Sequence, residues 1–337
     1  MLDSIKKQQN QTMLIIPSYL GASNTTGLIN FSSQVLNQSN EVINCDASYL
    51  NFVDPLALCI LSATCHEVSS KGQKINILNL NDNMNSYLAR MDVFENCNID
   101  IQTTNQRHDR SDSLVEVCIL DDCSQIPKLS SQIAHAIVGQ TPESTGSQIP
   151  DEMTGYTEAE RLTVPIEYIF SELLENALTH GKRGGFHEAS VWVAAQYYPK
   201  RDSIRLAIVD NGCGYLETLQ THPQLIARSH EGAISTALLP DVSCNNDLGL
   251  MGESINQGIG LTVVKDLAVS AGGTISIISG DRALSKGATH TRISVNDNWQ
   301  GSIVFLQVPR NSLKTLNIHE VIRPYQQHED TPHINFE

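Results

Sequence analysis

The segment SELLENALTHG, from Ser171 to Gly181, places three polar side chains at a regular spacing within an otherwise apolar stretch. Glu172, Asn176 and His180 follow one another at intervals of four residues, which stacks them along one face of an α-helix. The surrounding positions are mostly apolar, as expected for a helix that is largely buried. The stripe can therefore be interpreted in two ways, as a solvent-exposed face or as one wall of a binding site.

The bounds of this helix follow from the residues that flank it. Thr163 can cap the first turn, and Pro165 is well tolerated there because the first N–H groups of a helix have no intrahelical partner. Gly181 is typical of a helix end. We therefore expect the helix to begin near Thr163 and to end at Gly181.

Length and charge limit the classes of function. A chain of 337 residues fits two domains of about 150 residues each. The formal net charge of -15 argues against nucleic acid or an anionic membrane as the main partner, since both require basic surfaces. The apolar run from Leu56 to Ala63 is too short to span a bilayer, and the polar start MLDSIKKQQNQ does not resemble a signal peptide. The eight cysteines form no CxxC pair and are typical of reduced core residues, so we expect a cytoplasmic protein.

Residues 1–139 alternate segments typical of strands with segments typical of helices, which predicts a small α/β domain. The expected strands are residues 12–17, 41–48, 74–80 and 113–120, and the expected helices are residues 27–36, 54–70, 84–94 and 128–139. Residues 140–155 are rich in Gly, Pro, Ser and Thr without apolar periodicity, so we interpret them as a linker.

Residues 156–311 form the second expected domain, which begins with the helix described above. Further predicted elements are strands at 189–198, 203–210, 274–280, 289–296 and 302–309, a helix at 261–271, and a long polar loop before Gly260. This order predicts an α+β domain with a mixed sheet. Residues 312–337 show no periodicity and are expected to be disordered.

The motif DNGCG directly follows IRLAIV, residues 204–209 of a predicted strand. A carboxylate at this strand end, Asp210, can accept a hydrogen bond from the exocyclic amine of adenine and would repel the carbonyl of guanine. Gly212 and Gly214 would let a ligand approach the backbone closely. The same spacing also occurs in ordinary turns, so the motif alone does not decide between a turn and a binding site.

Two further motifs complete the set. In NQGIGL, Gly258 and Gly260 lead directly into a predicted helix, where free N–H groups could bind a phosphate or could simply mark a helix cap. In WQGSIVFLQVP, a predicted strand carries Gly301 and Ser302.

Taken in order, these motifs resemble the GHKL family of ATP-binding proteins over Thr157 to Arg310. Within that family, ELLENALTHG looks most like the anti-sigma-factor type of serine kinase. The resemblance implies a GHKL (Bergerat) ATP-binding α/β sandwich at residues 156–311, with ATP or ADP and Mg²⁺ as cofactors.

The resemblance also implies roles for individual residues. Glu172 would be the general base, Asn176 would hold the Mg²⁺ of the nucleotide, and Asp210 would bind the adenine amine. The other residues implied to contact ATP are Gly212, Gly214, Gly258, Gly260, Leu261 and Ser302. Leu216 to Gln257 would form a lid over the nucleotide. For His180 the residue pattern favours a structural role over a phosphate contact.

The first domain resembles STAS domains, the anti-sigma-factor antagonists, in the segments from Ile43 to Leu78 and from Tyr87 to Phe94. A phosphorylatable STAS domain has a serine directly after the aspartate that opens the helix, whereas Asp54 is here followed by Pro55, Leu56 and Ala57. The resemblance therefore implies a STAS-like regulatory or docking module at residues 1–139 without its phosphoacceptor. We expect its surface from Phe52 to Leu56 to face a nucleotide-binding domain of its own chain or of a dimer partner.

Several functions fit this reading. The leading expectation is a Mg-ATP-binding regulator with weak ATPase or serine/threonine kinase activity toward a partner protein of the antagonist or regulator type, in a bacterial-type partner-switching pathway. A homodimer is possible in such a pathway. The alternative is a non-catalytic switch in which ATP only sets the conformation, although the presence of Glu172 favours catalysis. A histidine sensor kinase fits less well, because His135 is the only histidine near the linker and no helical hairpin surrounds it.

Overall fold

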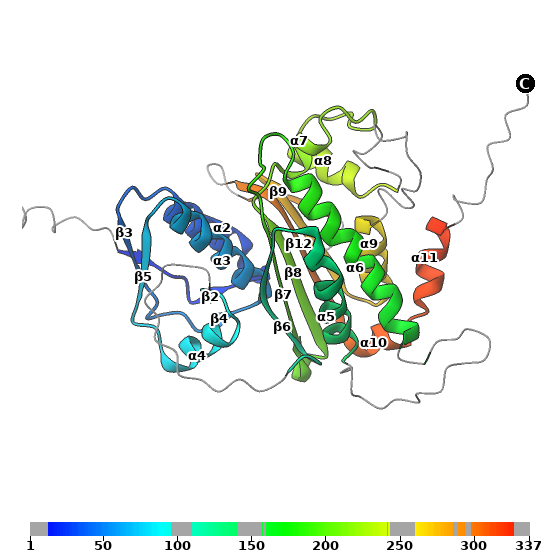
Figure 1. Ribbon diagram of the computed structural model, residues 1–337, viewed down its shortest axis with the longest axis horizontal. Helices are drawn as coiled ribbons and strands as arrows, with labels where there is room; N and C mark the ends of the chain where they lie inside the picture. Colours follow the sequence, from blue (N-terminus) through cyan, green and yellow to red (C-terminus); the bar gives the residue numbers. More distant parts are fainter. Residues whose placement is uncertain are drawn as a thin grey trace, which may run out of the picture.

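The computed structural model describes residues 13–95, 110–139, 157, 160–240, 242, 260–285, 289–293 and 298–326. These residues form two lobes that are stacked in four layers (Figure 1). A three-stranded sheet is followed by helices α2 and α3, then by a seven-stranded sheet, and finally by a layer of helices that includes α5, α6 and α9. Within the described part of the chain, no helix is both long enough and apolar enough to cross a bilayer.

The first lobe, residues 13–95, is built on parallel strands. Its sheet has the order β1 (Leu14–Ile15), β3 (Val42–Asp46) and β5 (Lys74–Leu78), and a separate pair joins β2 (Tyr19–Leu20) to β4 (Phe52–Val53). Its helices are η1 (Ala22–Asn24), α2 (Thr25–Leu36), α3 (Pro55–Ser70) and α4 (Asp82–Arg90). Helices α2 and α3 lie between this sheet and the second lobe (Figure 1).

The second lobe is organised by the seven-stranded sheet. Its order is β11 (Thr289–Arg292), β10 (Arg282–Ser285), β9 (Thr274–Gly280), β12 (Trp299–Pro309), β8 (Ser203–Asp210), β7 (Val191–Tyr198) and β6 (Leu114–Leu120). Every neighbouring pair is antiparallel, so the expected mixed sheet is wrong. Tight connections explain the direction of two of these pairs, because a short turn joins β7 to β8 through η3 (Pro199–Arg201) and another joins β9 to β10.

The helices of the second lobe cover one face and one end of this sheet. The face carries η2 (Cys123–Gln125), α5 (Ile126–Val138), α6 (Glu160–Gly181), α9 (Gly260–Ser270), α10 (Arg310–Thr315) and α11 (Ile318–Gln326). Helices α7 (Gly214–Thr218) and α8 (His230–Ala237) lie together at the upper end in Figure 1. Both fall in the stretch that the sequence predicts to be a polar loop.

The boundary predicted at residue 139 does not separate the two sheets. Strand β6 pairs with β7, and α5 packs against α6, where the Ser171 hydroxyl lies 2.9 Å from the Ser130 hydroxyl. The sequence places β6 and α5 in the first domain because the alternation of strands and helices continues through them. Alternation alone does not show which sheet a strand joins. The predicted linker, residues 140–155, lies outside the described residues.

Helix α6 begins earlier than the sequence predicts. It starts at Glu160, whose carboxylate accepts hydrogen bonds from the N–H (2.7 Å) and the hydroxyl (2.8 Å) of Thr157. The N–H of Glu160 in turn donates to the Thr157 hydroxyl at 3.2 Å. This reciprocal arrangement is a capping box, and it places Pro165 inside the helix rather than in its first turn.

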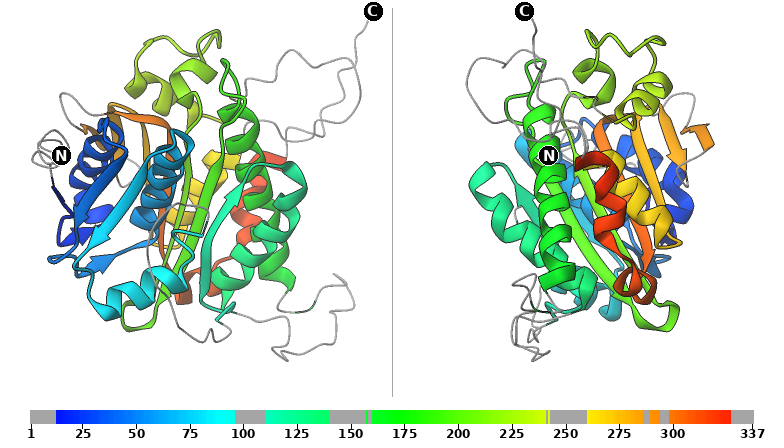
Figure 2. Two further views of the ribbon diagram at one scale, coloured as in Figure 1. Left: turned by 60° about the vertical axis from the view of Figure 1, so that its left-hand side comes forward. Right: turned by 90° about the vertical axis from the view of Figure 1, so that its right-hand side faces the viewer.

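Residues 312–326 are ordered, so the predicted disorder is wrong for this part of the tail. Helix α11 packs on α9 and α6, as Figure 2 shows, with Ile318 and Ile322 buried. The Tyr325 hydroxyl donates to the carboxylate of Asp266 on α9. The apolar residues Ile318, Val321, Ile322 and Tyr325 recur at the spacing of an amphipathic helix, and the prediction of disorder missed this signal. Residues 327–337 lie outside the described part.

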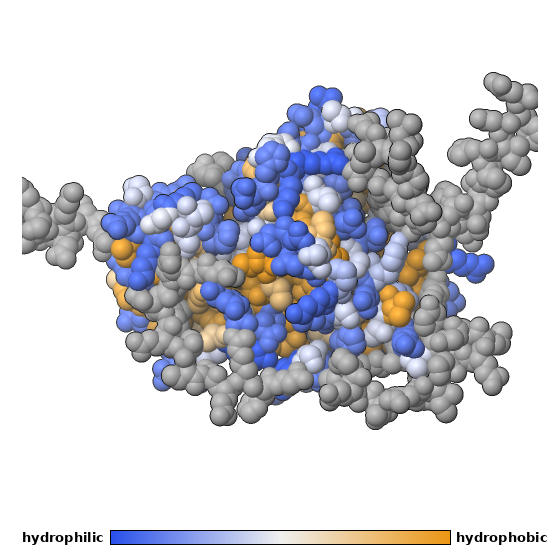
Figure 3. Space-filling view, viewed as in Figure 1, coloured by the Kyte–Doolittle hydropathy of each residue, from blue (hydrophilic) through white to orange (hydrophobic). Residues whose placement is uncertain are grey.

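Strand β8 is buried along its whole length because both of its faces are covered. Ile204, Leu206 and Ile208 belong to the core under the helical layer, whereas Ala207 and Val209 belong to the core shared with the first lobe. Because successive side chains of a strand point to opposite faces, β8 takes part in both cores. In Figure 3, hydrophobic residues gather at the centre of the visible face, where the strands meet the first lobe, while the surface over α2 is mainly hydrophilic.

Helix α3 fills the space between the two sheets. All of its residues from Pro55 to Cys65 are buried, which is unusual for a helix of a small α/β lobe with a solvent-exposed side. The thiol of Cys59 reaches the Ala207 carbonyl of β8 at 3.9 Å. The first lobe is therefore packed against the second over an apolar helix.

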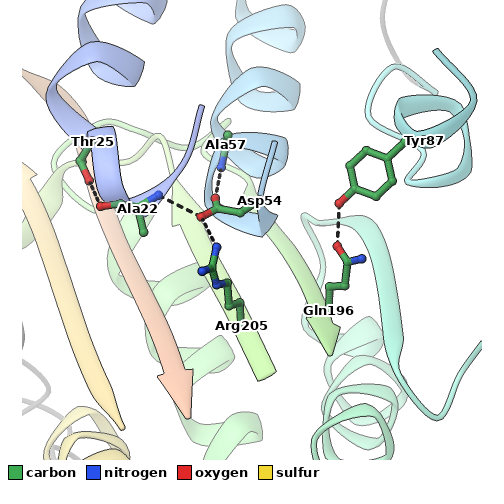
Figure 4. A network of polar contacts seen from close by, with 7 residues as sticks. All are labelled: Ala22, Thr25, Asp54, Ala57, Tyr87, Gln196 and Arg205. Atoms are coloured by element: carbon green, nitrogen blue, oxygen red, sulfur yellow. Dashed lines mark hydrogen bonds and ion pairs between the residues drawn. The ribbon is translucent and has the colours of Figure 1, made fainter. Parts of the chain in front are cut away.

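A buried ion pair fixes this contact at the start of α3 (Figure 4). The carboxylate of Asp54 accepts hydrogen bonds from the N–H of Ala57 (3.2 Å) and of Ala22 (2.9 Å), and it lies 3.3 Å from Arg205 on β8. Asp54 has no exposed surface and Arg205 is 7% exposed. Burial raises the pKa of Asp54, and the two N–H donors and the Arg205 charge oppose this shift. Asp54 thus faces the second lobe of its own chain, as we expect for the segment from Phe52 to Leu56.

Replacing Arg205 tests this contact. Arg205→Met should lower the free energy of unfolding by about 3–5 kcal/mol, because it leaves the Asp54 carboxylate buried without its charge partner. Urea unfolding followed by circular dichroism measures the change. The exposed pair of Lys71 and Glu67, at 3.1 Å, provides the control, and Lys71→Met should cost less than about 1 kcal/mol. Equal losses in the two variants would contradict a structural role for the buried pair.

Candidate functional site

A cavity lies between α6, the ends of β8 and β12, and helices α7 and α9. We call it the α6 pocket. Its lining residues are Leu173, Asn176, Ala177, His180, Gly181, Ile208, Asp210, Gly214, Tyr215, Thr218, Leu219, Ala237, Val242, Gly260, Leu261, Ser302 and Val304. The polar stripe of α6 therefore faces a cavity in part, since Asn176 and His180 both lie in its wall.

Six of the residues predicted to bind ATP converge on this pocket. They are Asn176, Asp210, Gly214, Gly260, Leu261 and Ser302, which come from four separate segments of the chain. Glu172 and Gly212 do not line the pocket but lie beside lining residues. Gly258 and the part of the predicted lid from 243 to 257 lie outside the described residues.

Asp210 is the buried acceptor at one end of the pocket. One carboxylate oxygen accepts a hydrogen bond from the N–H of Gly212 at 2.9 Å, and the other accepts one from the Ser302 hydroxyl. Burial raises the pKa of Asp210 to about 6, although the Ser302 and Gly212 donors lower it. The carboxylate is therefore ionised at neutral pH, and its two oxygens retain acceptor capacity for a ligand.

Glycines around Asp210 allow three chain segments to touch. A Cβ atom on Gly212 would lie 2.2 Å from the Gly181 carbonyl oxygen at the end of α6. A Cβ atom on Gly301, whose φ of 104° is unfavourable for other residues, would lie 2.1 Å from the Asp210 carbonyl oxygen. The sequence predicts that Gly212 lets a ligand approach the backbone. In the structure, Gly212 instead lets the backbone at Gly181 approach, and this packing fixes Asp210.

Glu172, Asn176 and Gly260 meet at the other end of the pocket. A Cβ atom on Gly260, the first residue of α9, would lie 3.5 Å from the Asn176 amide nitrogen and 3.5 Å from the Cβ of Glu172. Burial raises the pKa of Glu172, and the negative charge of Glu175 adds to the shift. A carboxylate with a raised pKa is a better proton acceptor than an ordinary one. The predicted base, the predicted metal ligand and a helix N-terminus are thus neighbours.

His180 lies in the pocket wall near the Asp210 end. Burial lowers its pKa to about 4, and the positive charge of Arg183 contributes to the shift. The imidazole is therefore neutral at pH 7 and does not offer a positive charge to a phosphate. Lys182 points elsewhere, because its ammonium group donates to the Asp121 carbonyl at 2.7 Å.

The sequence did not predict the wall formed by α7 and α8. Tyr215, Thr218 and Leu219 line the pocket from α7 and the residue after it, and Ala237 lines it from the end of α8. Thr218, Leu219 and Ala237 fall in the predicted lid and Tyr215 directly precedes it, in a stretch for which the sequence predicts no helix. The one-turn spacing of Tyr215 and Leu219 after Gly214 is the only signal of α7 in the sequence, and five residues are too few to establish a helical period.

The comparisons with known proteins agree with this geometry. Residues 162–310 match the family described as histidine kinase-, DNA gyrase B-, and HSP90-like ATPase. The match spans the pocket residues of α6, β8, α9 and β12 and does not extend to the first lobe. Neither the curated proteins nor the solved structures gave a significant match. The chain therefore carries a GHKL-type ATPase domain, a class of domain that binds ATP.

The raised pKa of Asp210 predicts a pH-dependent stability in the absence of nucleotide. The folded chain keeps a proton on Asp210 up to a pH of about 6, whereas the unfolded chain loses it near the ordinary value of 3.8. The free energy of unfolding should therefore fall as the pH rises between these values, by up to about 3 kcal/mol. Asp210→Asn should lack this component. Urea unfolding of both proteins at intervals from pH 4 to pH 7 measures the difference, and parallel curves would contradict the assignment.

Proposed function

We propose that this protein is a Mg-ATP-dependent regulator with ATPase or serine/threonine kinase activity toward a partner protein. The observation that carries the proposal is the arrangement along α6. Asp210, the proposed adenine acceptor, lies at one end of the pocket, Asn176 lies at the other, and Glu172 lies beside that second end. Gly181, which lies against Asp210, is nine helical steps from Glu172, a length of about 14 Å. An extended nucleotide could lie between these ends.

At the adenine end, recognition would depend on Asp210. Its ionised carboxylate would accept a hydrogen bond from the adenine amine, and the guanine carbonyl would be repelled. Leu219 and Ile208 supply apolar surface for the planar base in the same pocket. The fit is supported by the burial of Asp210, which is 3% exposed, because a buried carboxylate beside a cavity favours an occupant that donates to it.

At the phosphate end, Asn176 would hold the metal ion and the start of α9 would bind phosphate oxygens. An amide oxygen suits Mg²⁺, and the N–H groups at a helix N-terminus suit an anion. Bound Mg²⁺ would neutralise phosphate charge. Glu172 would accept the proton of a water molecule or of a partner's hydroxyl group, which its partial burial and raised pKa favour.

In a partner-switching pathway, the first lobe would act through contact with other protein surfaces. We propose that it is a STAS-like regulatory module that is not itself phosphorylated. Asp54 is fully buried, Pro55, Leu56 and Ala57 carry no hydroxyl, and Ser62 is only 3% exposed. A partner-switching role would then require a phosphoacceptor on another protein.

A second candidate function is a non-catalytic binding switch, in which ATP only selects a conformation. One observation favours it, because Glu172 lies beside the pocket and not among its lining residues. The two functions differ in whether bound ATP is turned over.

Nucleotide selectivity tests the adenine assignment. Isothermal titration calorimetry should show binding of ATP and ADP with Mg²⁺ and at least about tenfold weaker binding of GTP. Asp210→Asn should cost about 1.5–3 kcal/mol of ATP binding, because an acceptor oxygen is replaced by a donor amide. Equal affinities of the unmodified protein for ATP and GTP would refute the role of Asp210.

Paired variants on α6 distinguish catalysis from binding. Glu172→Ala should lower turnover of ATP by about 10²-fold or more with little change in affinity, whereas Asn176→Ala should weaken Mg-dependent binding by about tenfold. Thr179→Ala, in the same helix but exposed, is the control and should leave both quantities unchanged. Phosphate release and transfer of radiolabel to candidate partners measure turnover. Unchanged turnover in Glu172→Ala would refute Glu172 as the base, and binding of ATP without turnover by the unmodified protein would favour the binding switch.

A further inference from the structure

The two tryptophans of the chain, Trp192 and Trp299, lie in the core that both lobes share. Trp192 has no exposed surface, and Trp299 is 6% exposed. Their indole N–H groups differ in what they contact. The N–H of Trp299 donates to the main-chain carbonyl of Asp210 at 2.8 Å, whereas the N–H of Trp192 has no hydrogen-bond partner among the described residues. One of the two buried indoles is therefore bonded to the proposed adenine-binding residue, and the other is not.

Trp299 begins β12 beside an irregularity in that strand. The pairing of β12 with β9 shifts in register between Trp299 and Ser302, and the pairing of β12 with β8 ends at Ile303 and Val209. The indole donates to the next carbonyl of β8, that of Asp210, so a side-chain donor takes the place of a strand N–H there. Such bulges occur next to active sites, where they redirect side chains. Here Trp299 bonds to the main chain of Asp210 and Ser302 bonds to its carboxylate.

The turn that follows Asp210 is held at a second point. The side-chain amide of Gln300 donates to the carbonyl of Gly212 at 2.8 Å, and the N–H of Gly212 donates to the Asp210 carboxylate at 2.9 Å. Neither Trp299 nor Gln300 lines the α6 pocket. Both side chains can therefore affect the direction of the carboxylate through the main chain, without touching a ligand in the pocket.

We propose that Trp299 is a positioning residue for adenine recognition. Its N–H fixes the carbonyl of Asp210 and so sets the direction in which the carboxylate points into the α6 pocket, because hydrogen-bond recognition requires a closely held geometry. The inference rests on the proposed function, since it takes Asp210 as the adenine acceptor. Asn176 and Gly260, at the phosphate end, lie away from this turn and should not depend on the indole. Loss of the N–H should thus reduce the discrimination between ATP and GTP and not nucleotide binding in general.

Two matched substitutions in the full-length chain test the role of the N–H. Trp299→Phe and Trp192→Phe each replace a buried indole of the same core by a smaller aromatic ring, but only Trp299→Phe removes a donor to Asp210. In calorimetric titrations, Trp299→Phe should weaken ATP binding by about fivefold or more, the effect of one lost hydrogen bond, and should change GTP binding by less than about twofold. Trp192→Phe should change both affinities by less than about twofold.

Two outcomes of these titrations overturn the inference. Equal weakening of ATP binding in Trp299→Phe and Trp192→Phe would show that lost packing in the shared core is the cause. Equal loss of ATP and GTP binding in Trp299→Phe would show that the whole pocket is disturbed and that the direction of the carboxylate is not what changed.

The indole signals in an NMR spectrum of ¹⁵N-tryptophan-labelled protein test the same contact with Trp299 unchanged. Two indole N–H signals are expected, and Trp192→Phe assigns them by removing one. Saturating Mg-ATP should shift the Trp299 signal and leave the Trp192 signal in place, because the carbonyl that accepts the Trp299 proton belongs to the residue that would bind adenine. Equal shifts of both signals, or no shift while calorimetry shows bound ATP, would overturn the inference. An unmodified protein that binds no ATP, or binds ATP and GTP equally, would instead refute the proposed function.

Discussion

The burial of strand β8 on both faces is the constraint on which the rest of the structure depends. Its odd-numbered positions face the first lobe and its even-numbered positions face the helical layer, so one strand carries Arg205 toward Asp54 and ends in the adenine-binding candidate Asp210. A shift of one residue in its register would exchange the two faces. The fixed register of β8 between β7 and β12 therefore sets the interlobe contact and the α6 pocket together.

Much of the second lobe could be predicted because its signals are local. The bounds of β8 and β9 agree with the predicted segments 203–210 and 274–280, and the spacing of the α6 stripe predicted that Asn176 and His180 share a face. The motifs also predicted that Asp210, Gly260 and Ser302 share one site, and all three line the α6 pocket. What the sequence could not supply was the pairing of strands, since β6 joins a sheet whose other members lie more than seventy residues further along the chain.

The differences between the predicted and the observed structure have identifiable physical causes. A helix of five residues such as α7 is stabilised by tertiary contacts and is too short for its own sequence to show a period. The role of Gly212 was also not visible, because a glycine that admits a ligand and a glycine that admits another backbone look the same in a sequence. The apolar sequence of α3 predicts a buried helix, but it does not show that the helix lies between two sheets.

The position of α3 has a consequence for how such a chain can be rearranged. A helix in a core that both lobes share cannot be exchanged with one lobe alone, because the other lobe would lose the cover of its sheet. A fusion or a recombination event that supplies a different first lobe would have to bring an equally apolar helix and a carboxylate placed to meet Arg205. The two lobes therefore form one structural unit, and substitutions should be tolerated better on the surfaces that face outward than at the contact between the lobes.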